Sequence, residues 1–560
     1  MVHQSYKLEF KMWTANRYRV LYVAGFGAVL FLLGVYLGWS GFDTIINMRI
    51  RKSVVLEEGS EALNRFQKTP FPLEFKIYFF NISNPDEIMA GGKPAVSEIG
   101  PYVYDLYKAK PELEFKPDGT IEYNMTQRYF FNPLKSHGLS EHNEVTILNV
   151  PLIATAGMVE QTFPMGLTFL NNAIPFLFPD IKDIFMKATV RDLLWDGVVM
   201  HCNYSSGPAM PICNGLKGRA PATMVRNEET KDYTFAIFRH KNTTKEGPYR
   251  VLTGKDDVSQ IGEIVEFKNK PTLTNWEKNS TCTIIRGTDT TIFGPRKHLR
   301  DDLNIFVPDV CLSFSAVYSN STVYNGIPAN KYYSSSKNMA SGDTEPDNKC
   351  RCFKDDDGHK HCLKDGVIDV TKCQGAPVIF SNPHFFDANP DYQNSVIGLK
   401  PDEAKHKTFV ILEPKTGAPL EGRKRLQMNL MVKPIKDITI LTNVSEYLTP
   451  ILWIEEGTKL EGPLLNELQH LFHVMGLLDS FRWVLIGGGL VVLAIAAIFY
   501  LKVRRLLCFA GTQVVTPVDT TASANVQKLS TLNVGHEEFN VATFAQQASP
   551  QTKNGDVEMS

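Results

Sequence analysis

The sequence has no excess of charge of either sign, because 59 Lys and Arg residues stand against 60 Asp and Glu residues in 560. A nucleic-acid surface needs a basic cluster that releases counterions from phosphates, so this balance argues against a nucleic-acid partner. Long hydrophobic runs are also scarce. The mean hydropathy of -0.15 excludes a protein that lies mostly within a membrane.

Local catalytic motifs are missing as well. The chain has no GxSxG elbow, no Walker loop, no HExxH, and no GxGxxG followed by a suitable helix. The string HGLSEH, His137 to His142, has one residue too many for HxxEH. Scattered Ser, His and Asp side chains could still assemble in space, but nothing local supports an enzyme. We therefore expect no catalytic residues and no cofactor.

What the sequence does contain is two uncharged apolar runs, Val20 to Phe42 and Trp483 to Leu501. A helix rises about 1.5 Å per residue, so each run can cross a hydrocarbon layer of roughly 30 Å. Both runs are predicted to be transmembrane helices.

A secretory signal peptide is the alternative for the first run, which follows basic residues near the amino terminus. The run is longer than a usual signal core and lacks a small-x-small cleavage site, which favours an uncleaved anchor. Arg49, Arg51 and Lys52 weaken the charge bias, but two crossings still place both tails on one side. Basic residues before the first run and after the second place both termini in the cytosol: Lys7, Lys11, Arg17, Arg19, Lys502, Arg504 and Arg505.

The sequence thus predicts a membrane protein of five parts. Between the helices lies an extracellular domain that is large enough to bury a substantial core. The tail after the second helix has few aromatics and is predicted to be disordered. The parts are a cytosolic tail over 1–19, a transmembrane helix over 20–42, the extracellular domain over 43–480, a second helix over 481–501 and a cytosolic tail over 502–560.

Glycosylation sequons and cysteines support this topology. Eight of nine cysteines fall in the extracellular domain, and an even number in an oxidising compartment predicts disulfides. The ninth, Cys508, follows the basic KVRR segment in the tail and is a candidate for lipidation by palmitate, with an inert thiol as the alternative. All seven Asn-x-Ser/Thr sequons also fall in this domain: Asn81, Asn124, Asn203, Asn242, Asn279, Asn320 and Asn443.

The stretch CRCFKDDDGHKHC, Cys350 to Cys362, has enough soft ligands for zinc. Thiols in a secretory compartment oxidise readily, however, and the spacing matches no standard zinc module. A calcium loop fits worse, because counting back from Gly358 places Phe353 at the first ligand position. We expect disulfides here and no metal site.

Much of the domain is predicted to be β-strand. Apolar and polar residues alternate in LEFKIYFFN, Leu73 to Asn81, and in RLQMNLMVK, Arg425 to Lys433, which indicates strands with one buried face. Turn signals typical of antiparallel sheets occur at Asp118-Gly119, Asn325-Gly326, Asp357-Gly358 and Asp365-Gly366.

The region from about 153 to 196 is the exception, and we predict a helical subdomain there. Within it, four apolar residues recur at helical spacing: Ile181, Ile184, Phe185 and Ala188. The simpler interpretation is that this subdomain caps the β core with its apolar face.

A second interpretation makes the same region the site where an amphipathic ligand arrives. Lys182, Phe185 and Lys187 are then the candidate ligand-binding residues, with the lysines free to meet an anionic headgroup. An i,i+4 pair between Asp183 and Lys187 is an equally simple use of that charge. Elsewhere, Gly34 and Gly38 form a GxxxG in the first helix, which could join the two helices or two protomers.

Several motifs between the helices point to one family. Six cysteines show its spacing, including the CxC: Cys282, Cys311, Cys350, Cys352, Cys362 and Cys373. Further matches are EIGPY (Glu98 to Tyr102), VRDLLWDG (Val190 to Gly197), NGIP (Asn325 to Pro328), PHF (Pro383 to Phe385), EPKTG (Glu413 to Gly417), KRLQMNLMVKP (Lys424 to Pro434) and PILWIEEG (Pro450 to Gly457). On these residues the chain resembles the class B scavenger receptor, or fatty-acid translocase, family.

The resemblance implies an α+β membrane protein with an antiparallel β-barrel-like core, an apical helical bundle and an internal hydrophobic tunnel. It also implies that the apex receives ligand, which falls on the 153–196 region. The family pairing would join Cys282 with Cys350, Cys311 with Cys373, and Cys352 with Cys362. Cys202 and Cys213 lie outside the pattern and are paired because only they remain.

The function implied is that of a plasma-membrane receptor that binds lipids, fatty acids or lipoprotein particles and transfers them to the membrane. One alternative is a sensory neuron membrane protein that supports detection of pheromones or odorants; another is a protein-docking or lysosomal trafficking receptor. The extra cysteine pair and the long tail favour an invertebrate member, and the lack of a lysosomal signal favours the cell surface. A homo-oligomer or a receptor partner is left open.

Overall fold

The computed structural model describes residues 2–204, 206–296, 298, 301–354 and 359–504, with side chains from Tyr18 onward. The turn predicted at Asp357-Gly358, the tail predicted to be disordered and the candidate lipidation site at Cys508 lie outside these residues.

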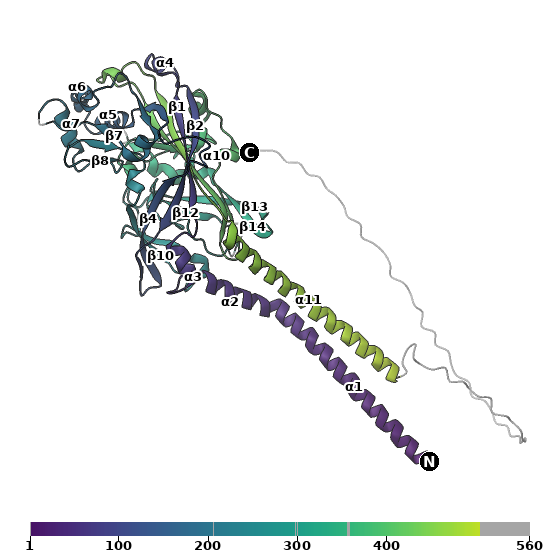
Figure 1. The fold of residues 1–560 in the computed structure, drawn as a ribbon. Coiled ribbons are helices and arrows are strands. Elements are labelled where there is room, and N and C mark those ends of the chain that lie inside the picture. The colour runs from purple at the N-terminus through teal and green to yellow at the C-terminus, as the bar shows by residue number, and fades with distance from the viewer. Residues whose placement is uncertain (1, 205, 297, 299–300, 355–358, 505–560) are drawn as a thin grey trace, which may run out of the picture. The chain divides into compact units, whose positions relative to one another are not determined.

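Two long helices begin and end the described chain (Figure 1). The first consists of α1 (Val2–Tyr36), a π-helical turn (Leu37–Gly41) and α2 (Phe42–Val54), and the second is α11 (Gly462–Arg504). Stretches of 37 and 43 residues, Tyr18–Val54 and Gly462–Arg504, are long and apolar enough to cross a membrane. The two predicted spans are confirmed, within helices that extend beyond the apolar runs.

Glycines let these two helices approach closely. A Cβ atom on Gly34 would lie 2.9 Å from the backbone nitrogen of Ile486, and one on Gly489 would lie 2.6 Å from that of Phe31. A Cβ on Gly38 would lie 2.9 Å from Cδ of Arg482. Small residues at such a contact permit close backbone packing. The GxxxG thus joins the two helices of one chain.

The core of the β-rich domain is one 14-stranded antiparallel sheet. Its main path runs in the order β11-β10-β4-β2-β1-β21-β20-β19-β14-β13-β12. The strands on this path are β1 (Leu73–Ile82), β2 (Val96–Ala109), β4 (Thr120–Phe131), β10 (Lys245–Leu252), β11 (Ile264–Phe267), β12 (Leu303–Val307), β13 (Leu312–Tyr324), β14 (Ile327–Ser334), β19 (Phe409–Leu412), β20 (Pro419–Val432) and β21 (Tyr447–Lys459). Strands β3 (Leu113–Phe115), β17 (Val367–Asp369) and β18 (Ile379–Ser381) pair beside it.

A short extended segment makes this sheet a nearly closed barrel. The Ile264 N–H of β11 donates to the Gly287 carbonyl at 3.0 Å, and the Phe306 N–H of β12 donates to the Thr288 carbonyl at 3.0 Å. Gly287 has φ +86°, and a Cβ there would overlap the carbonyl oxygen of Asn304. Only glycine allows this approach, so one residue helps to close the two sheet edges.

The predicted alternation accounts for one face of the central strands. Phe75, Ile77 and Phe79 of β1 are buried as expected. In β20, however, Gln427 and Asn429 on the opposite face are buried too, so the expectation of a single buried face is wrong there. Their amides are satisfied because Asn429 donates to the Ile379 carbonyl at 3.0 Å and the His384 N–H donates to Gln427 at 2.6 Å.

Turn chemistry follows the sequence closely. Asn325 and Gly326 link β13 to β14 between the paired residues Tyr324 and Ile327, with φ of +46° and +84°. Positive φ at both positions is the signature of a tight two-residue hairpin, as Asn-Gly predicts. Gly119 and Gly366 also adopt positive φ.

The 153–196 region is only partly helical. Helices α5 (Val150–Thr162) and α6 (Leu167–Leu177) lie near α7 (Ala209–Leu216) at one end of the domain (Figure 1). The helix expected at Ile181 to Ala188 is wrong, because Phe185–Thr189 forms β6 and pairs with β5 (Glu144–Leu148). Pairing with a distant strand has overridden the local apolar spacing.

The remaining elements are short. A small sheet contains β7 (Val198–Met200), β8 (Met224–Arg226) and β9 (Tyr233–Phe235), and β15 (Phe353–Lys354) pairs with β16 (Lys360–His361). The short helices are α3 (Glu61–Gln67), α4 (Pro85–Met89), α8 (Thr371–Gln374), α9 (Pro390–Asn394) and α10 (Glu403–His406).

Four disulfides staple the domain, and their pairs are those expected above. They join Cys202 with Cys213, Cys282 with Cys350, Cys311 with Cys373, and Cys352 with Cys362. In the stretch that raised the question of zinc, the thiols of Cys350, Cys352 and Cys362 are therefore occupied in covalent bonds.

A fully buried ion pair lies within the barrel. The Lys110 ammonium is 2.9 Å from Asp289 and donates to Thr291 Oγ1 at 2.6 Å. Burial lowers the pKa of Lys110 to about 8. Burial alone would raise the pKa of Asp289, but the Lys110 charge and hydrogen bonds lower it to about 2. Both groups are charged at neutral pH, and each depends on the other.

We expect Lys110→Met to destabilise the protein by about 3–5 kcal/mol, because it leaves the Asp289 carboxylate buried without its cation. Thermal unfolding of the full-length protein in detergent measures the effect. Lys116→Met is the matched control: its partner Glu114, 2.8 Å away, is largely exposed, so the loss should stay within about 1 kcal/mol. Equal melting temperatures for the two variants would contradict the assignment.

Candidate functional site

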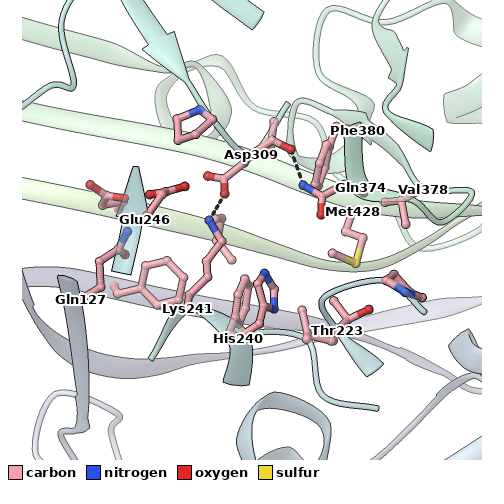
Figure 2. Close-up of a pocket in the computed structure, with 18 of the residues that line it drawn as sticks. Gln127, Thr223, His240, Lys241, Glu246, Asp309, Gln374, Val378, Phe380 and Met428 are labelled. Carbon is pink, nitrogen blue, oxygen red and sulfur yellow. Dashed lines mark hydrogen bonds and ion pairs between the residues drawn. The ribbon is translucent and has the colours of Figure 1, made fainter. Parts of the chain in front are cut away.

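One cavity lies inside the barrel against α5, and we name it the apical cavity. Its volume is about 110 Å³, and most of its lining is apolar. Val150, Pro151 and Ala154 come from α5. The barrel strands contribute Phe75, Met125, Leu426, Met428, Leu452 and Ile454, and further aromatic lining comes from Tyr129, Phe235, Phe238, Tyr249, Phe306 and Phe380. Figure 2 shows Met428 and Phe380 among the lining residues.

The second cavity, which we name the basal cavity, is larger, at about 840 Å³. The ends of the two spanning helices form part of its wall, with Ile50 and Val54 from α2 and Leu464, Leu468 and Leu471 from α11. The sheet contributes Leu73, Phe314, Ala316, Phe409, Val410 and Leu426. The basal cavity is therefore a largely apolar space that extends from the barrel to residues of both spanning helices.

The two cavities adjoin, because they share five lining residues: Lys108, Thr290, Lys424, Leu426 and Glu456. Three of these are charged. Lys424 and Glu456 are directly opposite each other on β20 and β21. Period-two alternation places Lys424 on the same face as Leu426 and Met428. The sequence therefore predicts that Lys424 points inward, but it does not predict which groups Lys424 contacts there.

Asp309 and Lys241 continue this polar wall on the apical side. Lys241 forms an ion pair with Asp309, and the Asp309 carbonyl accepts from Gln374 Nε2 at 2.5 Å (Figure 2). Asp309 and Gln374 each lie next to the Cys311–Cys373 disulfide in sequence, which holds their two loops together.

His240 also lines the apical cavity. Burial, and then the charge of Lys241, lower its pKa to about 4, so the imidazole is neutral at physiological pH. Solvent does not reach Nδ1 of His240, and this atom has no hydrogen-bond partner among the described residues. Buried polar atoms are almost always paired, so an orphan at a cavity wall is informative.

The three residues predicted to bind ligand lie away from both cavities. Lys182 and Lys187 are exposed, whereas Phe185 is buried in the core. Lys187 pairs with Glu144 across the β5–β6 ladder at 2.7 Å. The alternative i,i+4 pair is wrong, since Asp183 instead accepts from the Phe185 N–H at 2.8 Å.

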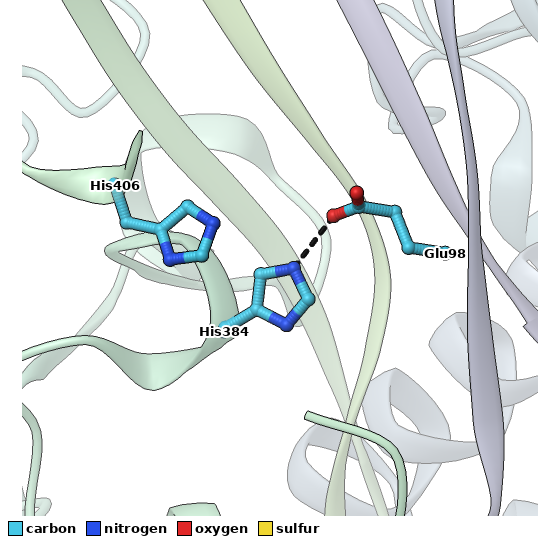
Figure 3. A group of neighbouring side chains, drawn as sticks. All are labelled: Glu98, His384 and His406. Atoms are coloured by element: carbon cyan, nitrogen blue, oxygen red, sulfur yellow. Dashed lines mark hydrogen bonds and ion pairs between the residues drawn. The ribbon is translucent and has the colours of Figure 1, made fainter. Parts of the chain in front are cut away.

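A cluster of Glu98, His384 and His406 has ligand atoms within 4.8 Å of one another (Figure 3). Glu98 Oε2 lies 2.6 Å from His384 Nε2 and accepts from the Trp453 indole at 2.7 Å. The Nδ1 atoms of His384 and His406 each accept a backbone N–H at 3.0 Å, from Lys400 and Asp402.

These hydrogen bonds fit a metal poorly. A histidine that ligates through Nε2 normally donates its Nδ1–H to an oxygen acceptor. Here both Nδ1 atoms already accept a backbone N–H, so neither ring can carry a proton on Nδ1 while Nε2 binds an ion. The cluster links β2 and β21 by hydrogen bonds to the 3-10 turn that carries His384, and the His384 ring stacks on that of His406 at the end of α10.

Two apolar helices long enough to span a membrane flank a β-rich domain with a nearly closed barrel and adjoining apolar cavities, an arrangement that fits a membrane-anchored receptor. The CD36 family model matches residues 25–500. The chain belongs to the CD36 family, the class B scavenger-type receptors, and is a two-span membrane protein of that family. Receptors of this family are lipid-binding proteins.

Sensory neuron membrane proteins of insects are among the proteins similar to this chain. The chain is 37% identical to Sensory neuron membrane protein 2 of Manduca sexta over 488 residues, which cover 86% of this chain and 94% of that protein. It is 33% identical to Sensory neuron membrane protein 1 of Apis mellifera over 85% of this chain and 90% of that protein. Sensory neuron membrane protein 2 of Drosophila melanogaster is 30% identical, over 86% and 98%.

The histidine cluster predicts a loss of stability in acid. Burial, and then the neighbouring His384, lower the pKa of His406 from 6.5 to about 4. Between these values the unfolded chain binds a proton that the folded chain does not, so stability falls as pH falls from 6.5 to 4. Near pH 5 this contributes on the order of 1 kcal/mol after screening.

We expect His406→Asn to flatten this pH dependence, because the asparagine oxygen can accept the Asp402 N–H without titrating. Melting temperatures at pH 7 and pH 5 measure the change. His142→Asn, at an exposed position, should leave the dependence as in the wild type. An unaltered slope in His406→Asn would show that other groups govern acid stability.

Proposed function

We propose that the protein is a cell-surface receptor that takes lipidic ligands into the apical cavity and passes them through the basal cavity to the membrane. The supporting observation is that the two cavities adjoin and that α2 and α11 line the second. In this proposal both termini lie in the cytosol and the β-rich domain lies outside the cell.

The physical case rests on the cost of exposing hydrocarbon to water, about 0.8 kcal/mol per methylene. A chain of about twelve methylenes would otherwise face a barrier near 10 kcal/mol on its way from a carrier to the bilayer. Apolar walls remove most of this barrier without any bond being made or broken. We therefore propose binding and transfer, not catalysis.

A sensory role is the second candidate, because the similar proteins are named sensory neuron membrane proteins. In that role the ligand would be a pheromone or another lipid-like odorant, and the chain would act beside a receptor partner. Transfer of a greasy molecule to the membrane is common to both candidates. The two candidates differ in the ligand that is carried and in what delivers it.

The apical end has features suited to uptake. Three apolar side chains are exposed there. Phe163 and Met165, between α5 and α6, are 57% and 81% exposed, and Phe169 of α6 is 56% exposed. We retain Lys182 and Lys187 as candidate headgroup contacts on this end. Lys182 is the better one, because Lys187 is already paired with Glu144. Phe185 would support them from beneath.

Filling the apical cavity tests the transfer proposal. Ala154→Phe places a ring in the cavity from α5, and we expect it to lower lipid transfer into vesicles that contain the full-length protein several-fold. The matched control is Ala404→Phe on exposed α10, which should transfer at the wild-type rate. Wild-type transfer by a correctly folded Ala154→Phe variant would favour a docking or trafficking role, in which the cavity is incidental.

Glycosylation tests the proposed topology. The sequon asparagines that are exposed are Asn203, Asn279, Asn320 and Asn443, and we expect glycans there when the protein is made in insect cells. Asn81, Asn124 and Asn242 are partly buried, so we expect lower occupancy. Glycopeptide mass spectrometry gives the answer, and Asn320→Gln should remove one glycan. A chain without glycans would place the domain on the cytosolic side.

A further inference from the structure

Charged side chains line the passage between the two cavities. Five side chains form what we name the charged partition: Lys108, Lys241, Asp309, Lys424 and Glu456. Lys108, Lys424 and Glu456 line both cavities, and Lys241 and Asp309 line the apical one. Any ligand that leaves the apical cavity for the basal cavity must pass these groups.

The partition is a continuous chain of ion pairs. Lys108 Nζ lies 2.6 Å from Glu456 Oε1, and Lys424 Nζ lies 3.9 Å from Glu456 Oε2. Lys424 also lies 3.4 Å from Asp309 Oδ2, and Asp309 in turn pairs with Lys241. The side chains are between 8% and 27% exposed, so the pairs are shielded from bulk water.

The Glu456 carboxylate is charged at neutral pH. Burial alone would raise the pKa of Glu456, but Lys108 and Lys424 lower it to about 2. Burial lowers the pKa of Lys241, and the charge of Glu246, which also lines the apical cavity, only partly offsets this effect. Apolar side chains of similar size could replace buried ion pairs without loss of stability, so stability alone does not account for these groups.

A plain hydrocarbon and a polar amphiphile would meet this barrier differently. A hydrocarbon must separate the ion pairs and offers the exposed charges nothing in return. A terminal oxygen group can accept hydrogen bonds from the lysine ammonium groups, which carry more N–H donors than the two carboxylates can use. His240, with its unpartnered Nδ1 at the same cavity, can hold that group before it crosses.

We propose that the charged partition and His240 determine the specificity of the passage, favouring chains that end in an oxygen-bearing polar group over plain hydrocarbons. The proposal rests on the proposed transfer function and adds the residues that select among the ligands. A molecule that can replace the hydrogen bonds of an ion pair passes the partition more easily than a molecule that cannot.

The test compares 1-hexadecanol with hexadecane, which differ only in the terminal hydroxyl. Both are delivered from cyclodextrin to phosphatidylcholine vesicles that contain the full-length protein, and uptake is measured relative to protein-free vesicles. We expect the wild type to accelerate uptake of the alcohol more than that of the alkane by roughly fivefold, the factor supplied by one net hydrogen bond. Equal acceleration of both would overturn this inference, whereas no acceleration of either would overturn the transfer function itself.

Two variants locate the effect. Lys108→Met with Glu456→Met replaces one ion pair of the partition by apolar chains, and the preference for the alcohol should fall towards one. The matched control is Lys433→Met with Glu160→Met, which removes both partners of an ion pair at 2.8 Å that lines neither cavity. His240→Phe keeps an aromatic ring but removes the ring nitrogens, so it should also reduce the preference for the alcohol. This single variant still tests the proposal if the double variant does not fold. An undiminished preference in folded His240→Phe and in the folded double variant would contradict the assignment.

Discussion

The pairing of β20 with β21 is the constraint on which the interior depends. These central strands run side by side from the Glu421–Lys459 pair to the Val432–Tyr447 pair. Because successive side chains alternate between faces, the pairing sends Leu426, Met428, Leu452 and Ile454 into the cavities and Gln427 and Trp453 to the other face. The same alternation points Lys424 and Glu456 inward. One strand pair therefore supplies both apolar and charged lining of the cavities.

The opposite face shows how the barrel tolerates burial of polar groups. Gln427, Asn429, Glu98 and His384 are connected to one another or to backbone atoms by hydrogen bonds of 2.6 to 3.0 Å. Satisfied in this way, buried polar groups cost little and fix the loops that they reach. On the cavity side, by contrast, Nδ1 of His240 has no hydrogen-bond partner among the described residues.

Much of this architecture follows from local patterns. Apolar length predicts both spans, alternation predicts β1 and β20, and Asn325-Gly326 predicts its hairpin. The stretch that contains Phe185 could not be predicted from spacing, because β6 exists only through its pairing with β5. Nor could the partition: Lys424 and Glu456 are visible as charges at the end of an apolar face, but Lys108, Lys241 and Asp309 come from three other segments that only the closed sheet brings together.

The disulfide between Cys311 and Cys373 has a consequence for how the protein must be made. It fixes the loop that carries Asp309 against the loop whose Gln374 binds the Asp309 carbonyl, and so it holds one of the two carboxylates of the partition in position. Protein produced in a reducing cytoplasm would lack this tether even if its barrel formed. Such material could look folded by spectroscopy and still have lost the electrostatic arrangement of its interior, so secretory expression is a requirement for measuring what this molecule prefers to carry.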